Sequence, residues 1–204
     1  MAIKPMLFDT EMVRAILDGR KSCTRRRIPI DIVNNCDVEK DGTLLAYENC
    51  DGDFIEPVKL CQYQPGDTLY VQETWCALPV NEAGHIRGHS VYYYKADGDL
   101  RPEGWRGKWK PSIHMPKEAA RIWLKVTDVR AERLQDITGQ DVLKEGLNSH
   151  VHPKASYFDM NQREMFENLW NSTIKKSDLD RYGWDASPWV WVIEFERCEK
   201  PEIN

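Results

Sequence analysis

Residues 19–27, Gly19-Arg20-Lys21-Ser22-Cys23-Thr24-Arg25-Arg26-Arg27, form the most informative stretch of this chain of 204 residues. A lysine, a threonine and a run of three arginines follow a short amphipathic segment. Cations gathered so closely repel one another, so the pattern indicates a nearby anion such as a phosphate or a carboxylate. A lysine three residues before a hydroxyl also suits a base–nucleophile pair. A solvated basic strand is the alternative interpretation.

The composition predicts one soluble domain, residues 1–204. Hydrophobic residues make up 41% and charged residues 30%, and the chain is long enough to bury a core without disulfides or metal. The net charge of -5 argues against general coating of nucleic acid but is compatible with a local basic patch. The chain has neither an apolar run of roughly 18 residues, as a membrane span needs, nor the apolar core of a signal peptide. We therefore expect a cytoplasmic protein without membrane contact.

Six cysteines are scattered without a C-x-x-C pair, and we expect them to be free thiols. Cys36, Cys50 and Cys61 share one segment, and His85 and His89 follow it. This spacing fits no usual zinc pattern. We expect neither a metal nor another cofactor.

Periodicity predicts a mixed α+β fold. Strands are expected over residues 4–8, 22–28, 68–75, 90–95, 120–134 and 189–197, and helices over residues 10–19, 136–146 and 161–173. In the long strand Ile122, Leu124, Val126 and Val129 should face the core, with a bulge near Asp128. The segment 29–64 should carry a small hairpin formed by residues 43–47 and 54–60. We expect the strands to be antiparallel and curled into a small barrel with the helices at its rim.

Several aromatic and acidic residues are further candidates. Trp189 and Trp191 share a strand face with Ile193, which favours the core. Trp75 and Tyr93 could offer rings on which a base stacks, although core packing is the commoner use of such residues. Glu73 lies in a strand beside Trp75, where we expect it to pair with an arginine of the basic run, either as a ligand contact or structurally.

The basic stretch resembles a known signature. The pattern Gly19-x-Lys21-x-x-Thr24-x-Arg26 is similar to the G-x-K-x-x-[E/T]-x-R motif of ASCH domains, a branch of the PUA-like superfamily. The longer resemblance is to phage- and prophage-encoded ASCH proteins. It extends through Pro111-Ser112-Ile113-His114-Met115-Pro116, Leu134-Gln135-Asp136-Ile137-Thr138 and Gly183-Trp184-Asp185-Ala186-x-Pro188-Trp189-Val190-Trp191. The resemblance implies a PUA-like small antiparallel β-barrel with about three flanking helices, and with insertions near residues 29–64 and 77–118.

The resemblance also implies a ligand and a set of catalytic residues. PUA-like domains bind RNA or modified bases, and one small bacterial ASCH subfamily hydrolyses the amide of N4-acetylcytidine with a lysine, a threonine and a glutamate. Lys21 and Thr24 match the first two, and Glu145, late in the short helix, matches the third. Arg20, Arg25 and Arg26 are then expected to bind the ligand.

The residues themselves leave several roles open. Thr24 could attack the acyl carbon, but Lys21 could take its proton only in the neutral form, which the neighbouring arginines favour and a paired Glu145 opposes. A carboxylate could instead be the base. In a flat strand residues three apart point to opposite faces, so Lys21 and Thr24 meet only if the chain turns between them.

Three function hypotheses follow. The first is hydrolysis of an N4-acylated cytosine or cytidine. The second is a module that binds RNA or single-stranded DNA without chemistry. A ribonuclease of phage origin is a variant of this second hypothesis. The third is a phage accessory protein that works through a host protein, for which the sequence carries no signal. The expected partner is a nucleoside, RNA or another single-stranded nucleic acid, and the sequence carries no signal for an oligomeric state.

Overall fold

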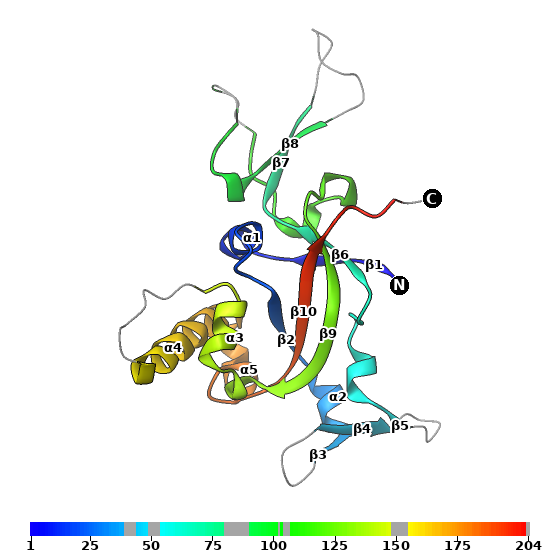
Figure 1. Cartoon of the computed structure of the whole chain (residues 1–204), viewed down its shortest axis with the longest axis vertical. Coiled ribbons are helices and arrows are strands. Elements are labelled where there is room, and N and C mark those ends of the chain that lie inside the picture. Colours follow the sequence, from blue (N-terminus) through cyan, green and yellow to red (C-terminus); the bar gives the residue numbers. More distant parts are fainter. Residues whose placement is uncertain are drawn as a thin grey trace.

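The structure is a computed structural model, and it describes residues 1–38, 44–48, 54–79, 90–101, 103, 107–147 and 155–202. Within these ranges the chain forms ten strands and five α-helices (Figure 1). The strands are β1 (Ile3–Leu7), β2 (Cys23–Arg27), β3 (Cys36–Val38), β4 (Leu44–Glu48), β5 (Phe54–Ile55), β6 (Thr68–Gln72), β7 (Trp75–Pro79), β8 (Ser90–Tyr94), β9 (Trp123–Arg133) and β10 (Trp189–Cys198). The helices are α1 (Thr10–Leu17), α2 (Ile30–Asn34), α3 (Gly139–Lys144), α4 (Ala155–Thr173) and α5 (Leu179–Tyr182).

Five strands form the main sheet, in the order β1-β6-β9-β10-β2. The pairs β6–β9, β9–β10 and β10–β2 are antiparallel, as the sequence predicts. β1 and β6 are instead parallel. The expectation of a wholly antiparallel sheet is therefore wrong for this pair, because the long segment between the two strands acts as a crossover connection.

The main sheet is strongly curved, as the bend of β9 in Figure 1 shows. In the described ranges β1 and β2 are its two edges, and no ladder joins them. Arg26 of β2 bridges these edges, since its Nη2 donates to the carbonyl oxygen of Leu7 in β1 at 2.7 Å. The predicted closed barrel is thus corrected to an open, curled sheet, because a side chain stands where strand pairing would have to continue.

β9 and β10 form the centre of the fold, and the bulge predicted near Asp128 is confirmed. The register shifts between Glu194, which faces Asp128, and Phe195, which faces Val126. Thr127 is therefore the extra residue of β9.

Residues 189–193, the first half of β10, are buried on both faces of the strand. Trp189, Trp191 and Ile193 join the four predicted core residues of residues 122–129 in one large apolar cluster, so these two tryptophans are core residues, as predicted. Val190 and Val192 point the other way and belong to a second apolar cluster. Its other buried members are Val142 of α3, Phe166 and Trp170 of α4, and Leu134, Ile137 and Trp184 outside these helices. Figure 1 shows these helices on one side of the sheet. The three predicted helices correspond to α1, α3 and α4, and α2 and α5 are short additions.

Two small sheets flank the main one, β3-β4-β5 and β7-β8. The predicted hairpin is present as the pairing of β4 with β5, but residues 57–60 form a 3-10 helix in place of a strand. Pro57 opens that helix, where a missing N–H group costs nothing. The strand expected over 68–75 is divided, because β6 ends at Gln72 and β7 begins at Trp75.

The cysteine predictions are tested only in part. Cys23, Cys36, Cys61, Cys76 and Cys198 are free thiols. Three members of the zinc spacing considered above, Cys50, His85 and His89, lie outside the described residues. Elsewhere in the described chain no three His, Cys, Asp or Glu side chains are grouped as a metal site would require. None of the described helices combines the length and apolarity that crossing a membrane demands.

Candidate functional site

The segment 20–22 lies against the carboxyl end of α3, and this contact begins the site. Gly19, at a φ of 74°, ends the first helix and turns the chain. The Ser22 N–H then donates to the Lys144 carbonyl at 2.8 Å, and Lys21 and Glu145 form an antiparallel bridge. Because Lys21 is held by α3 before β2 starts at Cys23, it does not follow the alternation of a flat strand.

Gly146 permits this close approach. Its φ of 90° lies in the left-handed region, and a Cβ at this position would lie 2.6 Å from Ala15 Cβ and 2.9 Å from Lys21 Cβ. The sequence predicts Gly146 only as a helix stop. The structure shows that the missing side chain also makes room for Lys21.

Lys21 and Glu145 form a buried ion pair. Lys21 Nζ lies 2.7 Å from Glu145 Oε2 and 2.9 Å from the Glu145 carbonyl oxygen. The two side chains are only 1% and 5% exposed. Both have lost most of their hydration, so the pair is held by its own hydrogen bonds and by further partners.

Arg25 is the principal further partner. Its Nη1 lies 3.1 Å from Glu145 Oε1, and its Nη2 lies 3.3 Å from Glu132 Oε2. Its Nε is buried and donates to no group in the described residues. The Glu145 carboxylate is therefore held between two cations, one on each oxygen.

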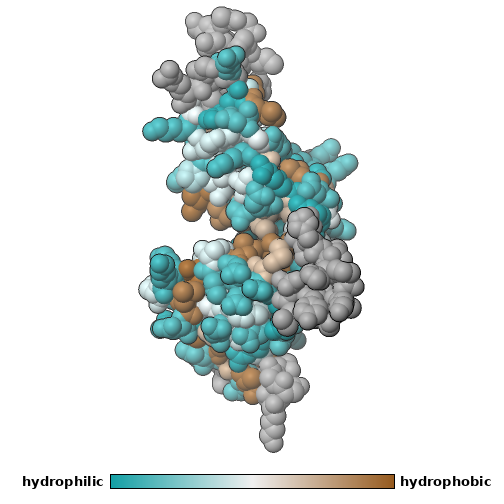
Figure 2. Space-filling model, turned by 90° about the vertical axis from the view of Figure 1, so that its left-hand side faces the viewer, coloured by the Kyte–Doolittle hydropathy of each residue, from teal (hydrophilic) through white to brown (hydrophobic). Residues whose placement is uncertain are grey.

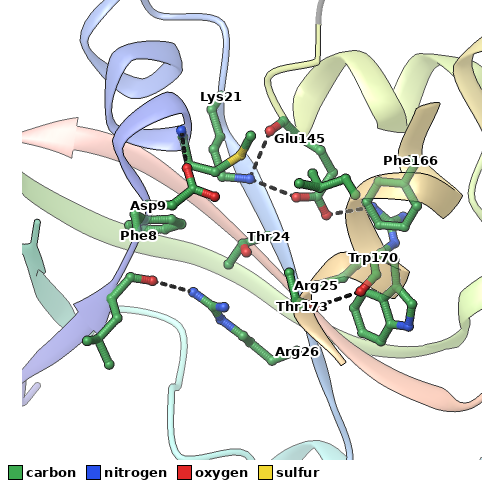
Figure 3. Close-up of a pocket in the computed structure, with 13 residues that line it drawn as sticks. Phe8, Asp9, Lys21, Thr24, Arg25, Arg26, Glu145, Phe166, Trp170 and Thr173 are labelled. Carbon is green, nitrogen blue, oxygen red and sulfur yellow. Dashed lines mark hydrogen bonds and ion pairs between the residues drawn. The ribbon is translucent and has the colours of Figure 1, made fainter. Parts of the chain in front are cut away.

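These residues line a pocket of about 120 Å³ (Figure 3). One wall comes from the β1–α1 junction, the other from α4, and the segment 21–26 with Glu145 lies between them. The lining residues are Leu7, Phe8, Asp9, Met12, Lys21, Thr24, Arg25, Arg26, Glu145, Phe166, Leu169, Trp170 and Thr173. In Figure 2 the molecule narrows to a waist on this side, with hydrophobic residues at its floor.

Thr24 lies in the middle of the pocket, between Lys21 and Arg26 (Figure 3). It is 4% exposed, and its hydroxyl makes no hydrogen bond within the described residues. The other hydroxyl of the lining, that of Thr173, donates to the Trp170 carbonyl at 2.7 Å. Thr24 is thus the hydroxyl left available to a ligand.

Cys23 is excluded as a nucleophile by its surroundings. Burial, and next the charge of Glu145, raises the pKa of the Cys23 thiol to about 12. The thiol therefore stays protonated near neutral pH.

Arg26 adds a guanidinium at the opposite end of the pocket from Lys21. Its carbon lies 5.5 Å from the centre of the Phe8 ring. Burial lowers the pKa of Arg26, while Tyr63, Glu145 and Asp9 act in the opposite direction. Beyond the bond to Leu7, its N–H groups make no hydrogen bond in the described chain, so they can donate to a ligand.

The other predicted ligand residues lie elsewhere. Arg20 donates to the Asp18 carboxylate and the Gly146 carbonyl, and does not line the pocket. Trp75 is 5% exposed and packs in a separate cluster with Met115 and Trp123. Tyr93 lies opposite Cys76 in the β7–β8 hairpin, also away from the pocket lining.

Glu73 is also away from the basic run, and its expected partner is corrected. Its two carboxylate oxygens accept from Arg121 Nε and Nη2 at 2.9 and 3.1 Å. β9 and β10 separate β6 from β2 in the sheet, so the basic run is out of reach. Burial raises the pKa of Glu73, against the influence of Arg121.

Sequence reasoning missed the aromatic walls of the pocket. They are formed by Phe8 on one side and by Phe166 and Trp170 on the other (Figure 3). Phe166 and Trp170 belong to the apolar stripe that predicts α4. Such a stripe indicates a buried face, but it does not tell a core from a ligand pocket.

Comparison with known proteins gives few matches. No protein-family model matches the chain, and no curated protein matches it. Among solved structures, the chain is similar to an ASCH domain from Lactobacillus crispatus JV V101, with 11% identity over 96% of this chain and 79% of that one, and a TM-score of 0.36. It is also similar to a hypothetical protein, PH0355, with 14% identity over 97% of this chain and 100% of that one, and a TM-score of 0.36. Because both TM-scores are low, the function is inferred from the geometry of the pocket.

Proposed function

We propose that the chain is a single ASCH-type, PUA-like domain, with insertions near residues 29–64 and 77–118, and that it hydrolyses the amide of an N4-acylated cytosine or cytidine. The observation that carries the proposal is that Lys21, Thr24 and Glu145 line one pocket. These are the three residues that match the amidohydrolase subfamily. Their proximity supplies a hydroxyl beside a cation–carboxylate pair, which is what amide cleavage through an acyl intermediate requires.

The size and walls of the pocket suit one flat ring. An engineered cavity of about 150 Å³ accepts benzene, so the 120 Å³ found here accommodates a pyrimidine rather than a whole nucleoside. Phe8 and the Phe166–Trp170 pair offer apolar surface on either side. Stacking of a base on an aromatic side chain contributes about 1–3 kcal/mol. The sugar then remains at the mouth of the pocket.

Formation of the acyl intermediate needs three proton transfers, and the Lys21–Glu145 pair can serve each of them. Lys21 first passes a proton to Glu145 across their 2.7 Å hydrogen bond. Thr24 Oγ1 then bonds to the acyl carbon while its proton moves to neutral Lys21. The C–N bond breaks as Lys21 returns that proton to the departing exocyclic amine. In the proposed reaction, Arg26 stabilises the negative charge that develops on the acyl oxygen.

Water completes the cycle. It attacks the threonine ester and gives its proton to the same pair, the acid leaves, and the proton returns to Thr24. One water is consumed, and one carboxylic acid and one cytosine amine are formed.

The test is release of cytidine from N4-acetylcytidine, followed by chromatography. The wild-type protein should turn the substrate over, and Thr24→Ala should lose about 10³-fold or more of kcat, because the nucleophile is gone. Thr24→Ser keeps the hydroxyl and should retain part of the activity. Thr127→Ala makes the same change at an exposed site on β9 and should have no effect.

Two results would contradict the hydrolase proposal. One is a wild-type protein that binds the nucleoside without turnover, which would make the pocket a binding site, as the second hypothesis has it. The other is unchanged turnover in Thr24→Ala.

A further inference from the structure

A second hollow adjoins the pocket. It has a volume of about 320 Å³ and shares four lining residues with the pocket, Arg25, Arg26, Trp170 and Thr173. Its remaining residues are Arg27, Ile174, Lys175 and Asp178. The two spaces therefore continue into one another along β2 and the carboxyl end of α4.

Arg27 and Lys175 differ from several other cations of the described chain, because neither side chain is paired with a carboxylate. Arg121 and Arg130 each pair with carboxylates, as Arg25 does. The side chain of Arg27 makes no ion pair or hydrogen bond in the described residues, and neither does the side chain of Lys175. The hollow thus holds unpaired positive charge, in a chain whose net charge is -5.

Arg27 is nonetheless held in place. Its guanidinium carbon lies 4.7 Å from the centre of the Tyr182 ring. Stacking on a ring fixes the plane of a guanidinium and leaves the N–H groups at its edge free to bind an anion in a bidentate manner. Asp178 is the one carboxylate of the lining, and it accepts a hydrogen bond from Ser177 Oγ at 3.1 Å. Two cations against one carboxylate leave the hollow positive.

We propose that this hollow is a phosphate subsite, and that Arg27 and Lys175 bind a phosphate on the ribose of the nucleoside whose base occupies the pocket. The inference rests on the proposed function in placing a base there. The ligand is then a phosphorylated nucleoside. Its phosphate is either the monoester of a free nucleotide or a phosphodiester of a single strand.

Binding of three unacylated ligands tests the subsite, because none of them can be turned over. Cytidine, cytidine 5′-monophosphate and a trinucleotide with a central cytidine are compared by calorimetry. The phosphate should tighten binding about 10-fold over cytidine, since charge-assisted hydrogen bonds contribute about 1.5–3 kcal/mol. The gain should fall with salt at a log–log slope of about one for each phosphate contact.

Arg27→Gln should abolish the gain and leave the affinity for cytidine unchanged. Arg197→Gln is the matched control, because it removes the same charge from an exposed position on β10 outside the hollow. Tighter binding of the monophosphate than of the trinucleotide identifies a free nucleotide. The reverse order with a steeper salt slope identifies a single strand. Either order supports the subsite.

Equal affinities for cytidine and its monophosphate would overturn the subsite, as would an Arg27→Gln variant that weakens both equally, or no binding of any ligand. The proposed function has a separate readout, since Arg27→Gln should still release cytidine from N4-acetylcytidine. A wild-type protein that releases cytidine but binds cytidine and its monophosphate equally would therefore contradict the subsite and leave the hydrolase proposal intact. Arg27-dependent binding of the monophosphate without turnover would support the subsite and contradict the hydrolase proposal.

Discussion

Lys21 Nζ lies 2.7 Å from Glu145 Oε2, although 124 residues separate the two in the chain. Arg25 Nη1 holds the other oxygen of the same carboxylate at 3.1 Å. One buried anion therefore neutralises two buried cations, with the partly exposed Glu132 as a second, more distant partner of Arg25. Because one carboxylate serves two cations, we expect Glu145, Lys21 and Arg25 to contribute unequally to the free energy of unfolding.

Glu145→Gln should be the most damaging change in this group. It leaves two buried cations without their common carboxylate, and breaking a buried pair from one side costs about 3–5 kcal/mol. Lys21→Met should cost less, because Arg25 still neutralises Glu145. Urea unfolding of both variants measures the difference, with Glu196→Gln at an exposed position of β10 as the control. A larger loss in Lys21→Met would show that Arg25 does not hold the carboxylate.

Gly146→Ala should separate Lys21 from Glu145. The new Cβ would lie 2.6 Å from Ala15 Cβ and 2.9 Å from Lys21 Cβ, so the segment 20–22 must move. Gly98→Ala is a matched control, because Gly98 has the same φ of 90° but no atom within 4 Å of an added Cβ. Both variants should lose about 1–2 kcal/mol from the left-handed conformation, but only Gly146→Ala should also lose turnover of N4-acetylcytidine. Equal behaviour of the two would mean that backbone strain alone matters at Gly146.

Gly146 and Arg25 show which structural roles can be predicted from the sequence and which cannot. A glycine after an amphipathic segment predicts a helix end, and the local pattern is enough because the cause is local. The role of Arg25 depends on Glu132 and Glu145, each more than a hundred residues away. A run of arginines therefore reads as surface charge, although one member is buried.

The same reason explains the errors in the fold. Alternation predicts which residues of β9 and β10 face the core, and these predictions agree with the structure. Alternation does not show which strands pair with one another. The parallel β1–β6 pair and the open edge of the sheet could therefore not be predicted from the sequence. Glu73 is similar, because its strand position predicts burial but not that Arg121 is its partner.

Cys23 should be inert in the folded protein although it lies next to Thr24 in the chain. Burial and Glu145 raise its pKa to about 12, so almost no thiolate forms at pH 8. Iodoacetamide at pH 8 should label the partly exposed Cys36 faster than Cys23, with the difference lost in urea. Cys23→Ala should keep turnover within about twofold, because the thiol takes no part in the proposed reaction. Native labelling of Cys23 at the rate of Cys36, or loss of activity in the variant, would contradict this assignment.

Asp67 should make the fold sensitive to acid. Burial alone would raise the pKa of its carboxyl, but hydrogen bonds from Lys4 and from the N–H groups of Ala2 and Gln64 outweigh burial and lower the pKa. A lowered pKa in the fold means that the carboxylate stabilises the protein above the unfolded pKa of about 4. That contribution is lost as the pH falls through the lower, folded value.

Asp67→Asn should therefore lower the free energy of unfolding by about 2 kcal/mol at pH 7, and the difference from wild type should shrink below about pH 4. Denaturant unfolding from pH 7 to pH 2.5 measures it, with the exposed Asp31→Asn as a control that should stay within about 0.5 kcal/mol of wild type at pH 7. Asp67 joins the turn before β6 to the start of β1, so this carboxylate helps to hold the parallel pair at the sheet edge. If the difference in free energy of unfolding between Asp67→Asn and wild type stayed constant on acidification, Asp67 would act through packing and not through its charge.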